Sequence, residues 1–141
     1  MPVTFDIRED GFVAYYTVTD PWTTDEFIAH YPEDIRFRSA ATHPVHWVLD
    51  FQGTTGMPPG ILRARNNSPL LKYPKSGHFY IIGAALYVRA IAETILRLVG
   101  KREAHFYNTF DEARNNLNEL LKQDKDKAAL NQPDKPTVAP V

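Results

Sequence analysis

Short apolar runs alternate along this chain with segments whose apolar residues recur at helical spacing. The runs at 45–51, 78–83 and 104–108 are rich in β-branched and aromatic residues and lack a clean in/out alternation. Such runs are typical of strands that are covered on both faces. The intervening segment 86–99 places apolar residues three and four positions apart, which is typical of an amphipathic helix. Strands that alternate with helices predict a mainly parallel sheet packed against helices.

The first 20 residues predict a different arrangement, an antiparallel hairpin. Residues 3–8 and 12–18 are β-rich and are joined by Glu9, Asp10 and Gly11, which are turn formers. The fold class predicted from the whole chain is therefore α/β. It has a four- to five-stranded, mixed but mainly parallel sheet, an N-terminal antiparallel hairpin and about four helices.

Capping residues mark where the predicted helices begin. Thr23 and Glu26 have capping-box spacing, and so do Thr109 and Glu112. Pro32 is expected to kink or divide the first helix. The second helix is predicted to begin at Pro58 or Pro59 and end near residue 66, the third covers 86–99, and the fourth places its apolar residues inward (Ala113, Leu117, Leu120 and Leu121).

The chain divides by composition near residue 121. Residues 1–121 predict one domain, which at this size buries enough surface to need no metal or disulfide. Residues 122–141 are charged and then proline-bearing, with little to bury, and predict a disordered tail.

Composition excludes several classes of function. The chain has no cysteine, which excludes disulfides, thiolate metal sites and a cysteine nucleophile. The net charge of −1 gives no field that would attract nucleic acid or an anionic membrane. The N-terminus lacks the pattern of a signal peptide, and Arg89, Glu93 and Arg97 interrupt the longest apolar stretch. We therefore expect a cytoplasmic protein with neither a nucleic-acid nor a membrane partner.

Four segments together resemble the STAS domain, the family of the anti-sigma-factor antagonists and of the cytoplasmic domains of sulfate transporters. They are LDFQG at 49–53, Gly60 at the start of the second helix, IIGA at 81–84, and FYNTFDEARNNL at 106–117. The resemblance covers roughly residues 3–121 and implies a STAS-like fold and a regulatory role through a protein partner.

In that family, the regulatory switch is a serine just before the second helix, which a partner kinase phosphorylates. The matching segment here is Met57-Pro58-Pro59-Gly60, and proline has no hydroxyl to phosphorylate. Thr54 and Thr55 lie too early in the loop to inherit the role. The resemblance therefore implies a module without the serine switch.

The loop after the third strand and the helix that follows it supply the candidate site. As an interaction surface, this segment would be made rigid by its two prolines, which lowers the entropy lost on docking. The same loop could cradle an anion, although the prolines remove two of the N–H donors such a site would use. The simpler alternative is a strand-to-helix turn. The candidate binding residues are Asp50, Gly53, Thr54, Thr55, Pro58, Pro59, Gly60, Arg63 and Arg65.

Other residues admit both a functional and an ordinary interpretation. Asp50 at a strand end is a candidate general base or cation ligand, or else the acceptor of a turn. The pair His43 and His46 is spaced unlike a zinc helix, so we predict no metal site and expect His43 at the surface. Five basic residues could bind an anionic ligand or an acidic partner, or form a solvated face (Arg63, Arg65, Lys72, Lys75 and Arg89). Six aromatic residues could line a dimer surface or a pocket, or belong to an ordinary core (Trp22, Tyr31, Tyr73, Tyr80, Tyr87 and Tyr107).

No acid/base pair, GxSxG, GxGxxG or GK[ST] motif is present, so the sequence predicts no enzyme and no cofactor. The leading hypothesis is a non-enzymatic regulatory or protein-interaction module, with a protein partner or self-association. The alternative is a small-molecule, lipid or anion carrier with the same fold.

Overall fold

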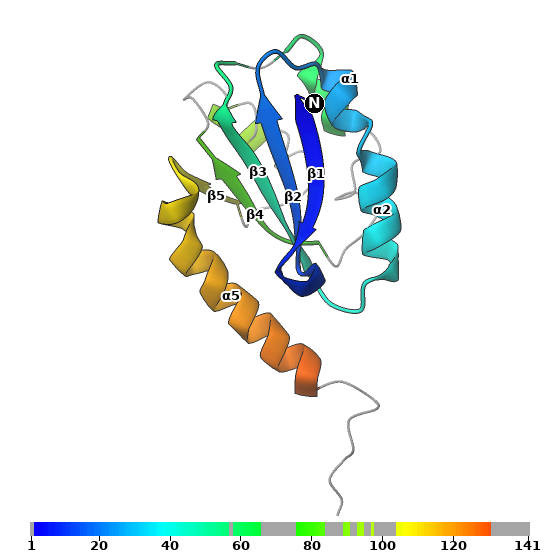
Figure 1. The fold of residues 1–141 in the computed structure, drawn as a ribbon, viewed down its shortest axis with the longest axis vertical. Coiled ribbons are helices and arrows are strands. Elements are labelled where there is room, and N and C mark those ends of the chain that lie inside the picture. The colour runs from blue at the N-terminus through cyan, green and yellow to red at the C-terminus, as the bar shows by residue number, and fades with distance from the viewer. Residues whose placement is uncertain are drawn as a thin grey trace, which may run out of the picture.

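The described part of the chain forms one five-stranded sheet in the order β1-β2-β3-β4-β5 (Figure 1). In this computed structural model, the described residues are 2–56, 58–65, 76–83, 89–90, 93–94, 97 and 104–130. β1 and β2 pair antiparallel, and every later pair is parallel. The predicted α/β class, with a mixed sheet and an N-terminal hairpin, is therefore confirmed. The strands are β1 (Val3–Arg8), β2 (Val13–Thr19), β3 (Val45–Gly53), β4 (Ser76–Ile82) and β5 (Ala104–Tyr107).

The hairpin turns through η1 (Glu9–Gly11), a single 3-10 turn. All three of its residues have positive φ, +57° at Glu9, +57° at Asp10 and +91° at Gly11. Glycine and residues with short polar side chains tolerate this left-handed conformation best, which suits Asp10 and Gly11 but not Glu9. The turn closes with a hydrogen bond from the Phe12 N–H to the Glu9 carbonyl, 3.1 Å.

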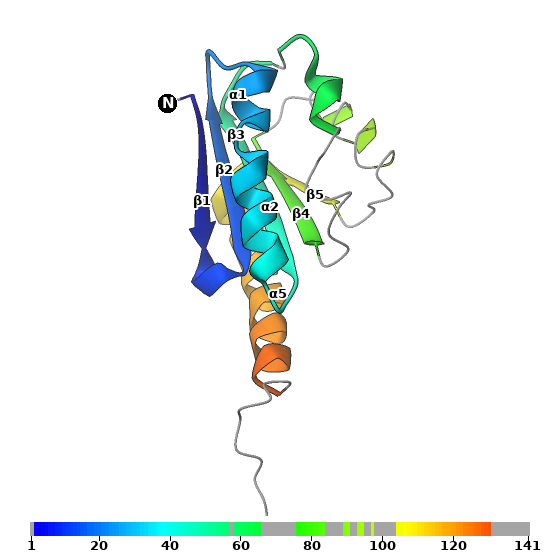
Figure 2. The ribbon, with the colours of Figure 1, turned by 90° about the vertical axis from the view of Figure 1, so that its right-hand side faces the viewer.

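Helices cover both faces of the sheet (Figure 2). α1 (Thr24–Ile28) and α2 (Tyr31–Ala40) lie on one face, and α5 (Phe110–Leu130) lies on the other. The Thr23 hydroxyl caps α1 by accepting the Glu26 N–H at 3.1 Å, as the capping-box spacing predicted. α1 ends before Pro32, which lies in the first turn of α2, so the predicted division of this helix is also confirmed.

Because successive strand residues face opposite ways, each strand supplies both cores. The core under α1 and α2 is strongly aromatic and includes Tyr16, Trp47 and Phe79, whose rings meet edge to face. The core under α5 joins Val48, Tyr80 and Ile82 of the sheet to three inward residues of the helix, Ala113, Leu117 and Leu121.

A charged pair is buried in the aromatic core. The Asp34 carboxylate receives hydrogen bonds from the Tyr16 hydroxyl, the Trp47 indole and the Arg38 guanidinium, at 2.8, 2.8 and 2.6 Å. Arg38 also donates to the Val45 carbonyl at 3.0 Å. These bonds offset the cost of removing two charges from water, and they fix how α2 sits on the sheet.

Two predictions about the helices need correction. Three α-helices, α1, α2 and α5, lie wholly within the described residues, fewer than the four predicted, and the segment after Pro59 is a short 3-10 helix, η2 (Ile61–Arg65). Most of the predicted helix over 86–99 lies outside the described residues, although Arg89, Ala90, Glu93, Thr94 and Arg97 are helical. None of the described helices is long and apolar enough to cross a membrane.

The last helix extends beyond residue 121, where the sequence predicted the ordered domain to end. α5 continues to Leu130, because Asp124, Lys125 and Ala128 each contact the rest of the domain. The remainder of the predicted tail, 131–141, lies outside the described residues.

Candidate functional site

The candidate site begins at the end of β3 with Asp50, whose carboxylate serves the turn. Its Oδ1 accepts the Gln52 backbone N–H at 3.0 Å, and its Oδ2 accepts the Tyr15 hydroxyl at 3.1 Å. Burial, together with the negative charge of Asp50, raises the pKa of Tyr15 to about 12. With these contacts in place, the geometry matches the turn-acceptor interpretation of Asp50 rather than the general-base one.

Gly53 allows β2 to approach the end of β3 very closely. A Cβ at this position would lie 2.7 Å from Cγ2 of Thr19, so only glycine fits without a shift. Its carbonyl accepts the Asp20 N–H at 3.0 Å, which ties the end of β3 to the loop after β2.

The two threonines of the loop are engaged in local hydrogen bonds. The Thr54 hydroxyl donates to the Phe51 carbonyl at 2.8 Å. Thr55 donates its N–H and its hydroxyl to Oδ2 of Asp20, at 2.8 and 2.7 Å. Neither lies at the start of η2, which begins at Ile61.

The rest of the loop is fastened to α1 and α2. The Thr24 hydroxyl donates to the Pro59 carbonyl at 3.1 Å, and the Tyr31 hydroxyl donates to the Ala64 carbonyl at 2.6 Å. Gly60 adopts φ +76°, a left-handed conformation suited to glycine. These bonds hold the segment in place as a short 3-10 helix.

Arg63 forms an ion pair with Asp25, with 2.9 Å between Nη1 and Oδ1, and both side chains are exposed. Arg89 donates to the Asn108 side chain at 3.0 Å, at the far edge of the sheet beside β5. The side chain of Arg65, and both Lys72 and Lys75, lie outside the described residues. The described members of the predicted basic set thus do not gather around one site.

One large apolar side chain of this segment faces solvent. Leu62 is 52% exposed, next to the half-buried Ile61. Within the described part of the chain, Leu130 at the end of α5 is the other large apolar residue with such exposure, at 77%. We call Thr54–Arg65, excluding Met57, the 54–65 platform.

A second cluster escaped sequence analysis. His46, His78 and His105 lie on β3, β4 and β5, on the face that α5 covers. The Nε2 of His46 contacts the Asp124 carboxylate of α5, and its Nδ1 accepts the His78 backbone N–H at 2.9 Å. Nδ1 of His78 and Nε2 of His105 lie 3.0 Å apart. The sequence feature that hinted at this cluster is the position of each histidine near the start of a predicted strand, but only the strand order brings the three together.

These histidines do not make a metal centre. Among the residues that the structure describes, no group of three histidine, cysteine or carboxylate side chains could hold a metal ion. Both ring nitrogens of His46 are used within the protein, so this side chain serves to connect elements.

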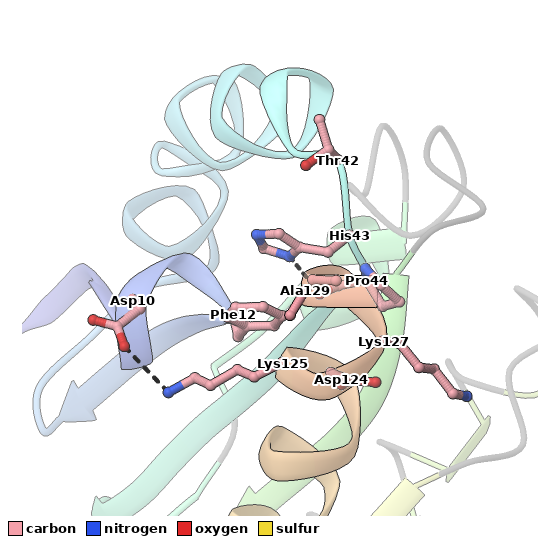
Figure 3. Close-up of a pocket in the computed structure, with 10 residues that line it drawn as sticks. Asp10, Phe12, Thr42, His43, Pro44, Asp124, Lys125, Lys127 and Ala129 are labelled. Carbon is pink, nitrogen blue, oxygen red and sulfur yellow. Dashed lines mark hydrogen bonds and ion pairs between the residues drawn. The ribbon is translucent and has the colours of Figure 1, made fainter. Parts of the chain in front are cut away.

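A groove lies beside Asp124, the residue of α5 that contacts His46 (Figure 3). In Figure 1 the last turns of α5 lie at the end of the sheet opposite α1, to which the 54–65 platform is fastened. Its volume is about 560 Å³. The rings of Phe12 and His43 stack in it with their centroids 3.9 Å apart, and Lys125 reaches across to Asp10 at 3.2 Å. His43 is thus half-buried against Phe12 rather than free at the surface. The remaining lining residues are Thr42, Pro44, Asp124, Lys127, Ala128 and Ala129.

The sequence matches no family model and no curated protein.

Proposed function

We propose that this chain is a non-enzymatic, STAS-like protein-interaction module and that the 54–65 platform is its contact surface. The observation that carries the proposal is Leu62, a large apolar side chain that faces water from a segment fastened at both ends. An apolar anchor on a rigid support is the typical centre of a protein interface, because little entropy is lost when it docks.

The partner that fits this surface offers an apolar socket for Leu62. Arg63 beside it is already paired with Asp25, so this side chain contributes little net charge to recognition. With proline in place of the family's serine, and with both threonine hydroxyls bonded inside the protein, the contact is constitutive rather than switched by phosphorylation.

A photo-crosslinking amino acid at position 62 tests the proposal in the cell that makes the protein. The crosslinked partner is identified by mass spectrometry, and its affinity for purified protein is then measured by calorimetry. We expect Leu62→Asp to weaken binding at least about tenfold, because a charge replaces the anchor of the interface.

Leu130→Asp is the matched control, since Leu130 is also exposed but lies at the end of α5. Equal affinity of the two variants for the partner would contradict the platform as the contact surface. So would a position-62 probe that crosslinks to no protein while the same probe at position 130 does.

The groove beside Phe12 supports the second candidate function, small-molecule binding. Its volume of about 560 Å³ falls in the range of ligand sites, and the stacked rings of Phe12 and His43 give it an apolar surface. Native mass spectrometry of freshly purified protein would show a bound ligand. Ala129→Trp fills the groove and should abolish that extra mass, whereas Leu62→Asp should leave it unchanged.

A further inference from the structure

α5 is held to the domain in two different ways along its length. Its first three turns bury Ala113, Leu117 and Leu121 against the sheet. Beyond Leu121, no residue of α5 is fully buried, and Ala128 only borders the apolar cluster. In Figure 1 these later turns reach past the end of the sheet. We call the segment Lys122–Leu130 the strap.

The main attachment of the strap is the contact between Asp124 and His46. His46 is 2% exposed and lies in β3, and its Nδ1 accepts the His78 N–H. Because Nδ1 is an acceptor, the proton of the neutral ring is on Nε2, which donates it to the Asp124 carboxylate. A hydrogen bond to a charged acceptor in a nearly dry site is stronger than one at the surface.

The sheet is shaped to admit this imidazole. Gly77 lies directly against it, and a Cβ on Gly77 would come within 2.4 Å of Nδ1 and 2.6 Å of Cε1. The space that receives His46 therefore exists only because residue 77 has no side chain.

The other polar attachment is weaker. The Lys125 amine lies 3.2 Å from an Asp10 carboxylate that is 86% exposed, so water and salt screen the pair. The strap is therefore held by one strong polar contact, one weak ion pair, the Lys125 amine 5.8 Å from the centroid of the Phe12 ring, and the edge packing of Ala128.

The strap is also one wall of the groove. Asp124, Lys125, Lys127, Ala128 and Ala129 line one side, and Phe12, His43 and Pro44 line the other (Figure 3). The groove consequently exists in this form only while the strap is docked.

We propose that the strap is a releasable gate, clasped by His46 and Asp124, that opens and closes the groove. Its release breaks polar contacts but leaves Ala113, Leu117 and Leu121 buried, so the first half of α5 stays in place. A cooperative unit of this size that is held by few apolar contacts has an opening free energy well below the free energy of global unfolding. The proposal does not depend on the 54–65 platform, which lies at the other end of the sheet.

Hydrogen exchange followed by mass spectrometry tests the clasp in the full chain. We expect Asp124→Ala to speed exchange of the amides of residues 122–130 at least about tenfold, because a buried hydrogen bond to a charged group is lost. Exchange of residues 112–121 should stay within about twofold of the parent protein.

Asp126→Ala is the matched control, since Asp126 is exposed on the same helix and the replacement is identical. Asp124→Asn keeps an acceptor for the His46 N–H and should give an intermediate increase. The proposal is overturned if the amides of residues 122–130 exchange at the same rate in Asp124→Ala and Asp126→Ala. It is also overturned if Asp124→Ala speeds amide exchange equally in both halves of α5.

Opening of the groove can be measured directly, because the chain has no cysteine of its own. Spin labels on Thr42→Cys and Ala129→Cys span the groove from two exposed positions. In the Asp126→Ala background we expect one narrow distance distribution, and in the Asp124→Ala background an added, longer population. Identical distributions in the two backgrounds would contradict release of the strap.

Discussion

The indole Nε1 of Trp47 on β3 donates a 2.8 Å hydrogen bond to Oδ2 of Asp34 on α2, inside an otherwise aromatic core. Asp34 is completely buried, and Arg38 one turn later supplies the opposite charge. A carboxylate in such surroundings is tolerated only while its charge partner and hydrogen-bond donors stay in place.

Asp34→Asn should therefore destabilise the protein strongly. It leaves the Arg38 charge buried without its counter-charge, which typically costs about 3–5 kcal/mol. Urea denaturation measures the loss in the free energy of unfolding. The control is Asp25→Asn, which removes one partner of the exposed ion pair with Arg63 and should lower the free energy of unfolding by no more than about 1 kcal/mol. The double variant Asp34→Asn/Arg38→Met should recover part of the loss, because it removes both charges while the asparagine oxygen still accepts from Tyr16 and Trp47. A double variant less stable than Asp34→Asn would argue against a charge effect.

Gly77→Ala should lower stability through its collision with His46. The new methyl group would lie 2.4 Å from Nδ1, and forcing extra volume into a packed site typically costs about 1–3 kcal/mol. Thermal unfolding measures the effect. In a His46→Ala background, the same substitution should cost much less, and a strictly additive double variant would show that the two residues do not compete for space.

Alkaline pH should weaken the fold in part through Tyr15. Its pKa is raised to about 12 by burial and then by Asp50, whereas a tyrosine in the unfolded chain titrates near about 10. The folded state therefore keeps a proton that the unfolded state loses, so this contribution to stability is complete below pH of about 10 and is lost as pH rises to about 12.

Tyr15→Phe should make the fall of stability over this pH range shallower, as measured by urea titrations at several pH values. Asp50→Asn should bring the phenol absorbance titration of Tyr15 to lower pH, because it removes a neighbouring negative charge. An unchanged titration would show that burial alone sets the pKa of Tyr15.

Tyr31→Phe should loosen the 54–65 platform while leaving its surface chemistry intact. It removes the hydroxyl that donates to the Ala64 carbonyl at 2.6 Å, a buried bond whose loss costs about 1–2 kcal/mol. Hydrogen exchange of the platform amides should accelerate, and partner affinity should fall through the added ordering cost. Tyr107→Phe is the control, since Tyr107 lies on β5 under the opposite helix layer. Faster platform exchange in that variant would mean that the effect is general destabilisation.

The sequence by itself determined the local elements, because their signals lie within a few neighbouring residues. Glu9-Asp10-Gly11 specified the hairpin turn, and Thr23 with Glu26 specified the start of α1. The apolar runs specified the central strands, and from the alternation of strands and helices the mixed α/β class followed.

Tertiary structure decided what depends on distant partners. The segment after Pro59 became a 3-10 helix that Thr24 and Tyr31 hold from other elements. α5 ran past residue 121 because Asp124 meets His46, a residue 78 positions earlier. The three histidines became neighbours only through the order of β3, β4 and β5. Short-range patterns set backbone propensity, whereas contacts between remote residues depend on strand order, which no local pattern in this chain encodes.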